Sequence, residues 1–356
     1  MRSDQASTSM LLDIASAGER LVAVGERGHI LYSENQGASW VQADVPTSMM
    51  LTRVFFASPS LGWAVGHDGN ILFSRDGGVN WELQRDGVKD QARINEERAG
   101  RAKIAMDALY QQLKTAPEDE TEELEEALEE AAWAMDSARE MLDEPVYAPP
   151  LMDVWFANEN QGWAAGAYGT LLHTSNGGRH WDDWSHKVDN PDELHLNGVV
   201  GGPEGTLYLA SEWGTVFRST SAGENWEPLE TGYEGSFFGV LSNPVSGSVF
   251  AYGLLGTIYR SYDQGENWEE APAMARASLL GGLATPDGAL YFVGQGGTVT
   301  YSSDDGESFT PLVQSSRAGV HGIALMADGR FMVTGDGGSR LLSTGNKQPN
   351  NRGGTQ

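Results

Sequence analysis

The sequence predicts an all-β fold, a seven-bladed β-propeller with an inserted antiparallel α-helical hairpin. Three observations lead to this prediction. A unit of roughly 40 residues, the usual size of a four-stranded propeller blade, recurs along the chain. Glycine is abundant, at 45 of 356 residues, as expected for short strands joined by tight turns. One interval between units is enlarged by a segment rich in Ala, Glu and Leu, a composition that favours helix.

The repeated unit combines a G-x-x-G turn, an apolar triplet and the motif S/T-x-D/N-x-G-x-x-W. Its clearest copy begins at Gly66, continues through Ile71–Phe73 and ends at Trp81. The first position of the turn recurs seven times, at Gly25, Gly66, Gly166, Ser211, Gly253, Gly294 and Gly335. The closing aromatic residue keeps the same step, at Trp40, Trp81, Trp181, Trp226, Trp268 and Phe309. Seven units predict seven blades.

Each unit is expected to form four strands. The second unit illustrates them with Leu51–Ala57, Gly62–Val65, Asn70–Ser74 and Trp81–Gln84. Apolar triplets without polar alternation indicate strands that neighbouring blades cover on both faces. The last unit, Val320–Thr344, provides only three strands. Residues before Met10 are expected to supply the fourth, because an unpaired edge would expose backbone groups to aggregation.

The insert between Val88 and Glu144 predicts two helices. Apolar residues in each helix alternate spacings of three and four, which predicts two facing seams. The seam residues are Ala99, Ala102, Met106, Leu109 and Leu113 in the first helix, and Leu124, Leu128, Ala131, Met135, Ala138 and Leu142 in the second. Thr115–Glu118 has the residues of a capping box, so the second helix is expected to start there. The hairpin is either a solvated decoration or a docking arm for a partner.

These patterns divide the chain into four segments. Blades 1 and 2 are expected in residues 1–87, the hairpin in 88–145, blades 3–7 in 146–344 and a disordered, polar tail in 345–356.

Composition excludes several classes of function. The net charge of −27 argues against nucleic-acid binding, because phosphates would be repelled. With no cysteine there is no disulfide, thiol nucleophile or thiolate metal site. The seven histidines never show the short paired spacing of zinc sites, so neither a metal nor a cofactor is expected. No apolar stretch is long enough to span a membrane, and the first residues lack the pattern of a signal peptide. The protein is thus expected to be cytoplasmic, or a mature segment whose leader was removed.

Two motifs carry a resemblance to known families. Ser74–Trp81 and Ser261–Trp268 resemble the Asp-box, or bacterial neuraminidase (BNR) repeat, in which the serine and aspartate bind the backbone of a turn and the tryptophan packs between blades. GWAVGHDGNILFSRDGGVNW and GWAAGAYGTLLHTSNGGRHW make the chain similar to the photosystem II stability and assembly factor family.

That resemblance implies a seven-bladed propeller that assists the assembly of a membrane complex from the lumenal or periplasmic side. Its relatives in non-photosynthetic proteobacteria are associated with resistance-nodulation-division transporters. The photosynthetic members share a basic, arginine-lined patch, whereas this chain is strongly acidic. The resemblance therefore implies a different membrane partner from the photosystem.

The expected function is a non-catalytic scaffold, an accessory or assembly factor for a membrane protein complex, in particular an envelope transporter. A periplasmic location is expected, with the cytoplasm as the alternative. The alternative function is an Asp-box glycoside hydrolase or a sialidase-like carbohydrate-active protein. Sialidases resemble six-bladed rings with three converging arginines, whereas only Arg27 and Arg53 stand at candidate positions here. No enzymatic activity is therefore expected.

Two groups of residues are candidates for a site. The G-x-x-G turns are expected to present partner-binding side chains on one rim, because loops on a rigid scaffold usually carry binding. These residues are Glu26, Arg27, His67, Asp68, Tyr168, Glu212, Trp213, Leu254, Leu255 and Asp336.

The second group faces the central channel. Counting back from each turn to the innermost strand aligns Asp13, Arg53, Asp153, Gly198, Gly239, Gly282 and Gly322. Arg53 is expected to pair with Asp13 and Asp153. The simpler interpretation of this group is structural, as mutual satisfaction of charge.

Overall fold

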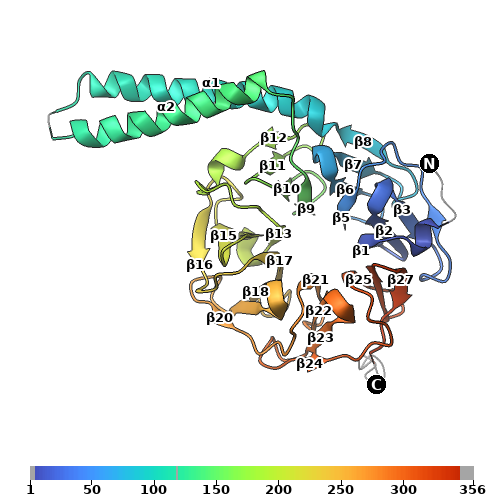
Figure 1. The fold of residues 1–356 in the computed structure, drawn as a ribbon. Helices are drawn as coiled ribbons and strands as arrows, with labels where there is room; N and C mark the ends of the chain where they lie inside the picture. The colour runs from blue at the N-terminus through green and yellow to red at the C-terminus, as the bar shows by residue number, and fades with distance from the viewer. Residues whose placement is uncertain (1–4, 118, 345–356) are drawn as a thin grey trace. The chain divides into compact units, whose positions relative to one another are not determined.

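The computed structural model describes residues 5–117 and 119–344, and the chain forms two compact units. One unit lies within Met1–Arg85 and Pro149–Gln356, and the other is Asp86–Ala148. The first unit consists of seven antiparallel sheets, which Figure 1 shows arranged as a ring around a central axis. The second contains two helices. The predicted seven-bladed β-propeller with an inserted helical hairpin is confirmed. The tail expected in residues 345–356 lies outside the described residues.

Within each blade the strands follow one another in sequence order, and Figure 1 places the first strand nearest the axis. Blades 1 to 3 contain β1 (Leu11–Ala17), β2 (Arg20–Gly25), β3 (Ile30–Ser33), β4 (Val41–Gln42), β5 (Leu51–Phe56), β6 (Gly62–Gly66), β7 (Ile71–Ser74), β8 (Glu82–Arg85), β9 (Leu151–Phe156), β10 (Gly162–Gly166), β11 (Leu171–Thr174) and β12 (Asp182–Asp183). Blades 4 to 6 contain β13 (Gly198–Gly201), β14 (Leu207–Ala210), β15 (Thr215–Ser219), β16 (Glu227–Glu230), β17 (Phe237–Ser242), β18 (Val249–Gly253), β19 (Ile258–Ser261), β20 (Glu269–Glu270), β21 (Leu279–Ala284), β22 (Leu290–Gly294), β23 (Val299–Ser302) and β24 (Thr310–Pro311). Blade 7 contains β25 (Val320–Leu325), β26 (Phe331–Gly335) and β27 (Gly338–Leu341).

The core lies between successive blades. Every residue of β6, β10, β18, β22 and β26 is buried, because a neighbouring blade covers each face of these strands. Between blades 1 and 2, Trp81 packs in one cluster with Val22, Val24 and Leu51. The repeat tryptophan thus contributes to the contact between blades.

The first glycine of each turn is required by a close backbone approach. A Cβ on Gly25 would lie 2.2 Å from the carbonyl oxygen of Met10, and one on Gly294 would lie 2.0 Å from that of Ser278. These oxygens belong to the residue just before the inner strand of the same blade. In blade 4, Ser211 takes the position of the glycine, and its Oγ donates a hydrogen bond to the equivalent carbonyl, that of His195, at 2.8 Å.

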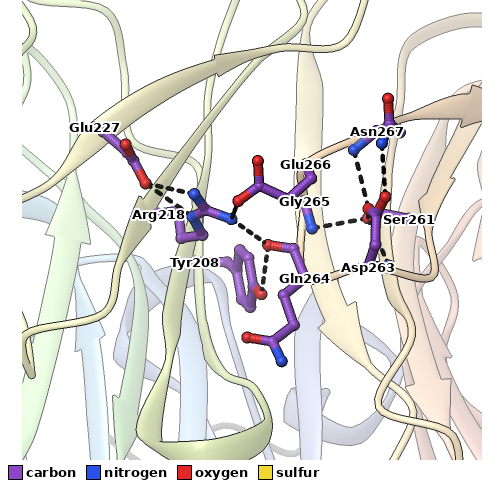
Figure 2. A network of polar contacts seen from close by, with 9 residues as sticks. All are labelled: Tyr208, Arg218, Glu227, Ser261, Asp263, Gln264, Gly265, Glu266 and Asn267. Carbon is purple, nitrogen blue, oxygen red and sulfur yellow. Dashed lines mark hydrogen bonds and ion pairs between the residues drawn. The ribbon is translucent and has the colours of Figure 1, made fainter.

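The S/T-x-D/N-x-G-x-x-W turns lie at the opposite rim and are closed by their own side chains. In blade 5 the Gly265 N–H donates to Ser261 Oγ at 2.7 Å, and the Asn267 N–H donates to Asp263 Oδ1 at 2.9 Å (Figure 2). Blade 2 repeats this arrangement with Ser74 and Asp76. These side chains are occupied in forming the turn.

The same turns join neighbouring blades. Arg218 of blade 4 donates to the Gln264 carbonyl of blade 5 at 2.9 Å and contacts both Glu227 and Glu266 (Figure 2). The Tyr208 hydroxyl donates to the same carbonyl at 3.0 Å. Arg20 of blade 1 makes the equivalent bond to the Asp76 carbonyl of blade 2. Hydrogen bonds and ion pairs at this rim therefore hold neighbouring blades together.

The expected closure of blade 7 by an N-terminal strand is wrong for the described residues. Ala6–Thr8 form a 3₁₀-helix in which the Thr8 N–H donates to the Gln5 carbonyl, so this backbone is not available for a ladder. A Cβ on Gly338 would lie 2.1 Å from the Ser7 carbonyl oxygen, and one on Gly28 would lie 2.4 Å from that of Thr47, in the connector between blades 1 and 2. The N-terminal segment therefore takes the place of an inter-blade connector.

The hairpin consists of α1 (Gly87–Leu113) and α2 (Thr121–Asp143). Most of the predicted seam residues are partly buried and Ala138 is buried, whereas Leu142 is 46% exposed. The expected capping box is wrong, because the Thr115 hydroxyl donates to the Gln112 carbonyl at the end of α1. Carbonyls at a helix C-terminus lack helical partners, and the threonine serves one of them. Glu118 lies outside the described residues, and α2 begins only at Thr121.

Replacing Gly294 by alanine should destabilise the propeller by roughly 1–3 kcal/mol, because the new Cβ would force the Ser278 carbonyl out of its position. Gly296 in the same turn is the matched control, since nothing lies within 4 Å of its Cβ position and only its φ of +65° opposes a side chain. Gly296→Ala should cost no more than about 1 kcal/mol. Urea unfolding would measure both. Equal losses would contradict the close approach as the reason for the glycine.

Candidate functional site

The turn rim is the end of the propeller that carries the seven G-x-x-G turns. At the third turn position the backbone is left-handed in six blades, with φ between 52° and 65°. The residues are Arg27, Asp68, Tyr168, Trp213, Leu255 and Gly296. This conformation rotates the side chain away from the blade. The turns therefore hold their third residue outward in a fixed direction.

Three of these positions carry large apolar side chains on successive blades. Tyr168 is 52% exposed, Trp213 is 65% exposed and Leu255 is 68% exposed. A left-handed conformation costs a residue other than glycine of order 1 kcal/mol, and it is uncommon for bulky residues. Blades 3 to 5 thus keep apolar side chains exposed at a cost in stability, which is typical of a binding surface.

His195 joins two of the predicted residues across blades 3 and 4. The Tyr168 ring meets the imidazole edge to face, with ring centroids 4.9 Å apart. Glu212 Oε2 accepts the His195 backbone N–H at 2.9 Å and lies 3.8 Å from its Nδ1. The sequence analysis missed His195 at this site. The sequence did offer a clue to His195, because this residue directly precedes the buried Leu196, where the inner segment of blade 4 begins.

A groove extends the apolar surface across blades 5 and 6. Two adjoining cavities of about 390 and 350 Å³ share the connector residues Ala273, Met274 and Ala275. Met274 is 74% exposed and left-handed, with φ of 54°, and Val313 on the next connector is 89% exposed. Leu255 lines the first cavity, and Arg276 and Arg317 line the second. The sequence analysis considered only turns and therefore missed these connectors.

Apart from Leu254 in the turn of blade 5, the remaining predicted turn residues belong to the turns of blades 1, 2 and 7. Glu26, Arg27, His67 and Asp68 belong to the turns of blades 1 and 2. In blade 7, Asp336 accepts the Gly319 N–H at 2.8 Å and lies 3.2 Å from His321 Nε2. Burial lowers the pKa of His321, and the Asp336 carboxylate opposes that change. Asp336 thus orders its own blade.

On β1, β5 and β9, the innermost strands of blades 1 to 3 (Figure 1), Asp13, Arg53 and Asp153 meet. Arg53 Nη1 lies 3.5 Å from Asp13 Oδ1, and its Nε lies 3.1 Å from Asp153 Oδ1. Asp13 also accepts the Val54 N–H of blade 2, and Asp153 accepts the Val199 N–H of blade 4, each at 2.9 Å. The three side chains therefore tie four successive blades together.

Burial and ion pairing shift the pKa values of these two carboxyl groups in opposite directions. Burial raises the pKa of Asp13 and of Asp153, and the positive charge of Arg53 opposes both changes. Burial also raises the pKa of Tyr252, which contacts Arg53, to about 12. Both carboxylates are committed to a guanidinium and to backbone N–H groups, an arrangement suited to holding blades in register.

The alignment of Gly282 with the channel residues is wrong by one position. In the sheet, Asp13 pairs with Val24, Arg53 with Val65 and Gly281 with Val293, each one residue before the turn glycine. The aligned position stands 12 residues before the turn glycine in blade 1 (Asp13 to Gly25) and 14 in blade 5 (Gly239 to Gly253), so counting back from the turn is uncertain by one residue. A slip of one residue reverses the face of a strand.

In the described ranges, which omit residues 1–4, 118 and 345–356, no group of three or more His, Cys, Asp or Glu is placed to hold a metal ion. Neither helix there is long and apolar enough to cross a membrane.

Replacing Arg53 by methionine should destabilise the propeller by about 3–5 kcal/mol at pH 7.5, because two buried carboxylates lose their counter-charge. Without Arg53 their pKa values should rise further above the unfolded value of about 3.9. The folded state then binds protons more readily than the unfolded state, so the loss should shrink as the pH falls toward 5. Thermal unfolding across this range measures the effect.

Arg75→Met is the control, since Arg75 forms an exposed pair with Glu82 and should contribute no more than about 0.5 kcal/mol. A loss for Arg53→Met that is independent of pH would argue against buried charges as its cause.

Comparisons with known proteins agree with part of the resemblance seen in the sequence. A family model described as photosynthesis system II assembly factor YCF48 matches residues 132–281, from within α2 to the start of blade 6. A photosystem II assembly lipoprotein, Ycf48 of Synechococcus sp. (strain CC9902), is 32% identical over 76 residues. That match covers 21% of this chain and 22% of the relative, so it spans about a fifth of the relative's length.

Solved structures cover nearly the whole chain at lower identity. A structure of YCF48 bound to D1 peptide has a TM-score of 0.64 at 15% identity and covers 96% of this chain and 95% of the other. YCF48 from Cyanidioschyzon merolae has a TM-score of 0.61 at 15% identity, with 94% and 95% covered. A streptogramin B lyase has a TM-score of 0.65 at 13% identity, with 95% and 94% covered. The chain thus shares the propeller fold of these proteins, and residues 132–281 are similar to the YCF48 assembly factors.

Proposed function

We propose that this protein is a non-catalytic scaffold that binds a segment of a membrane protein complex on its turn rim and acts as an accessory or assembly factor. The binding surface consists of Tyr168, Glu212, Trp213, Leu254 and Leu255 with the groove beside Met274. The observation that carries the proposal is the left-handed backbone of Tyr168, Trp213 and Leu255, which keeps three apolar side chains exposed on successive blades.

The shape and charge of this surface suit a peptide segment. The groove is concave and apolar at Met274, and it has Glu270 at the first cavity and Arg276 and Arg317 at the second. Neither arginine forms an ion pair with another residue in the described ranges, although the chain carries a net charge of −27. A segment with apolar side chains and a carboxylate would match these features.

The related proteins support the same role. YCF48 is known bound to D1 peptide, so a propeller of this fold can hold a peptide. The Synechococcus relative is an assembly lipoprotein, which favours a periplasmic location for this chain over a cytoplasmic one. For the partner we retain an envelope transporter complex of the resistance-nodulation-division class, because the acidic composition is unlike the basic patch of the photosynthetic members.

A sialidase or glycoside hydrolase would require two carboxylates able to act as acid and nucleophile. Asp13 and Asp153 are held instead by Arg53 and by backbone N–H groups. The aspartates of the repeat motif, such as Asp263, close turns at the opposite rim. Because these aspartates are held by hydrogen bonds and ion pairs, a binding function is favoured over hydrolysis.

Photo-crosslinking tests the proposed surface. Benzoylphenylalanine placed at Trp213 or at Leu255 should form adducts with a membrane complex in native cells. Val245 is the matched control, since it is 66% exposed and lies in the loop at the other end of β18. Mass spectrometry identifies the adducts. The proposal would be wrong if adducts formed equally from position 245, or if none formed from Trp213 or Leu255.

Leu255→Gly separates binding from stability. Removing the side chain relieves the left-handed strain while making the unfolded chain more flexible, so the free energy of unfolding should stay the same or rise by up to about 1 kcal/mol. Recovery of the membrane complex with the protein should fall. Glu204→Gly is the control, because Glu204 has φ of 55° in the loop between β13 and β14, at the opposite rim. Undiminished recovery with Leu255→Gly would show that the strained leucine does not serve binding.

A further inference from the structure

The outer face of α2 carries a row of carboxylates with one tryptophan at its centre. Trp133 lies two residues from the seam residue Ala131, which turns its side chain to the opposite face of the helix, and it is 75% exposed. Residues three, four and seven positions away share its face. Together with Glu122 one turn beyond them, the carboxylates at these positions form the acidic ridge: Glu122, Glu126, Glu129, Glu130, Asp136 and Glu140.

Most of the acidic ridge adds nothing to the stability of the helix that carries it. Glu122 lies in the first turn of α2, where a negative charge favours the helix N-terminus. Asp136 and Glu140 near the other end are four residues apart, a spacing at which like charges destabilise a helix by a few tenths of a kcal/mol per pair. The sole basic residue of α2 is Arg139, and within the described ranges no residue of α2 forms an ion pair. The seam packs the hairpin through the other face, so beyond Glu122 the ridge is not explained by charge stabilisation of the helix.

The tryptophan is uncovered as well. On α1, Lys114 Nζ lies 4.3 Å above the ring of Tyr110, so that aromatic side chain has a cation of its own. Among the described residues no cation lies over the Trp133 ring, although an indole is the best aromatic partner for one. Tryptophan is one of the residue types most enriched among interface hot spots.

We propose that the acidic ridge docks a cationic segment of a partner protein, with a Lys or Arg side chain over Trp133 and further basic residues against the carboxylates. The charge of the ridge selects this occupant, because acidic segments and anionic lipid surfaces would be repelled. This site is independent of the turn rim. It gives the hairpin a role in capturing a basic part of a partner through long-range attraction, which speeds encounter in dilute salt.

The probe is a fluorescent synthetic peptide of lysine and leucine with helical spacing, titrated into the full-length protein by fluorescence anisotropy. Trp133→Ala should weaken binding roughly tenfold, as loss of a hot-spot residue does. Ile104→Ala is the matched control, because Ile104 is 71% exposed on the outer face of α1 without such a row of carboxylates. It should bind the peptide like the unmodified protein. Far-UV circular dichroism verifies that both variants keep their helices.

A second pair of variants separates the ridge from general charge. Glu129→Gln with Asp136→Asn should weaken binding and reduce its dependence on salt, whereas Glu96→Gln with Glu159→Gln removes two exposed carboxylates elsewhere and should change little. Binding that Trp133→Ala leaves intact, equal losses for both pairs, or capture of phosphatidylglycerol vesicles would each overturn the proposal. Leu255→Gly should leave peptide binding unchanged, so failure here is distinct from failure of the turn-rim proposal.

Discussion

The close approach of one backbone carbonyl to one glycine in six of the seven blades determines the geometry of the turn rim. In blades 1, 2, 5, 6 and 7 the distance from the missing Cβ position to that oxygen is 1.9–2.2 Å, which no side chain tolerates. The carbonyl belongs to the start of the inner strand, so the approach fixes the turn relative to the axis. The last glycine of the turn then contacts the connector to the next blade, as Gly297 does at the Ser316 carbonyl. Between these two points the third residue lies in the left-handed region in six of the seven blades.

Closure of the ring follows from the same constraint. Blade 7 presents Gly338 where blades 1 and 3 to 6 present a glycine to their connectors, and Ser7 fills that place. Ala6 packs with Met326 and Met332, and Ser16 Oγ donates to the Leu325 carbonyl at 2.8 Å, so side chains of the first and last blades join the two ends. Contacts at the turn rim and in the core between blades can thus close a propeller whose last described blade has three strands.

The sequence predicted the fold well because its period is enforced in six of the seven blades by backbone contacts that only glycine allows. Seven turn positions and six aromatic residues were enough to predict seven blades. It predicted the meeting of Asp13, Arg53 and Asp153 for the same reason. The alignment of Gly282 was wrong because the distance between the inner-strand position and the turn differs by one or two residues among the blades. The capping box predicted at Thr115 was wrong because this residue lies between two helix ends. Its hydroxyl donates to a carbonyl at the end of α1. The groove at Met274 and Val313 could not be found, because it depends on how two connectors of irregular sequence lie side by side.

The two rims of the propeller differ in how their arginines are paired. At the opposite rim, cations are shared between carboxylates and carbonyls of adjacent blades, as Arg218 is between Glu227 and Glu266 (Figure 2). Such networks stabilise the ring and leave few groups for a ligand. At the turn rim, Arg276 and Arg317 have no carboxylate partner among the described residues, and bulky side chains occupy strained positions. A molecule with far more acidic than basic residues could easily have paired these arginines. The proposed binding surface rests on this difference: among the described residues Arg276 and Arg317 have no carboxylate partner beside exposed apolar residues, whereas Arg218 at the opposite rim contacts two carboxylates.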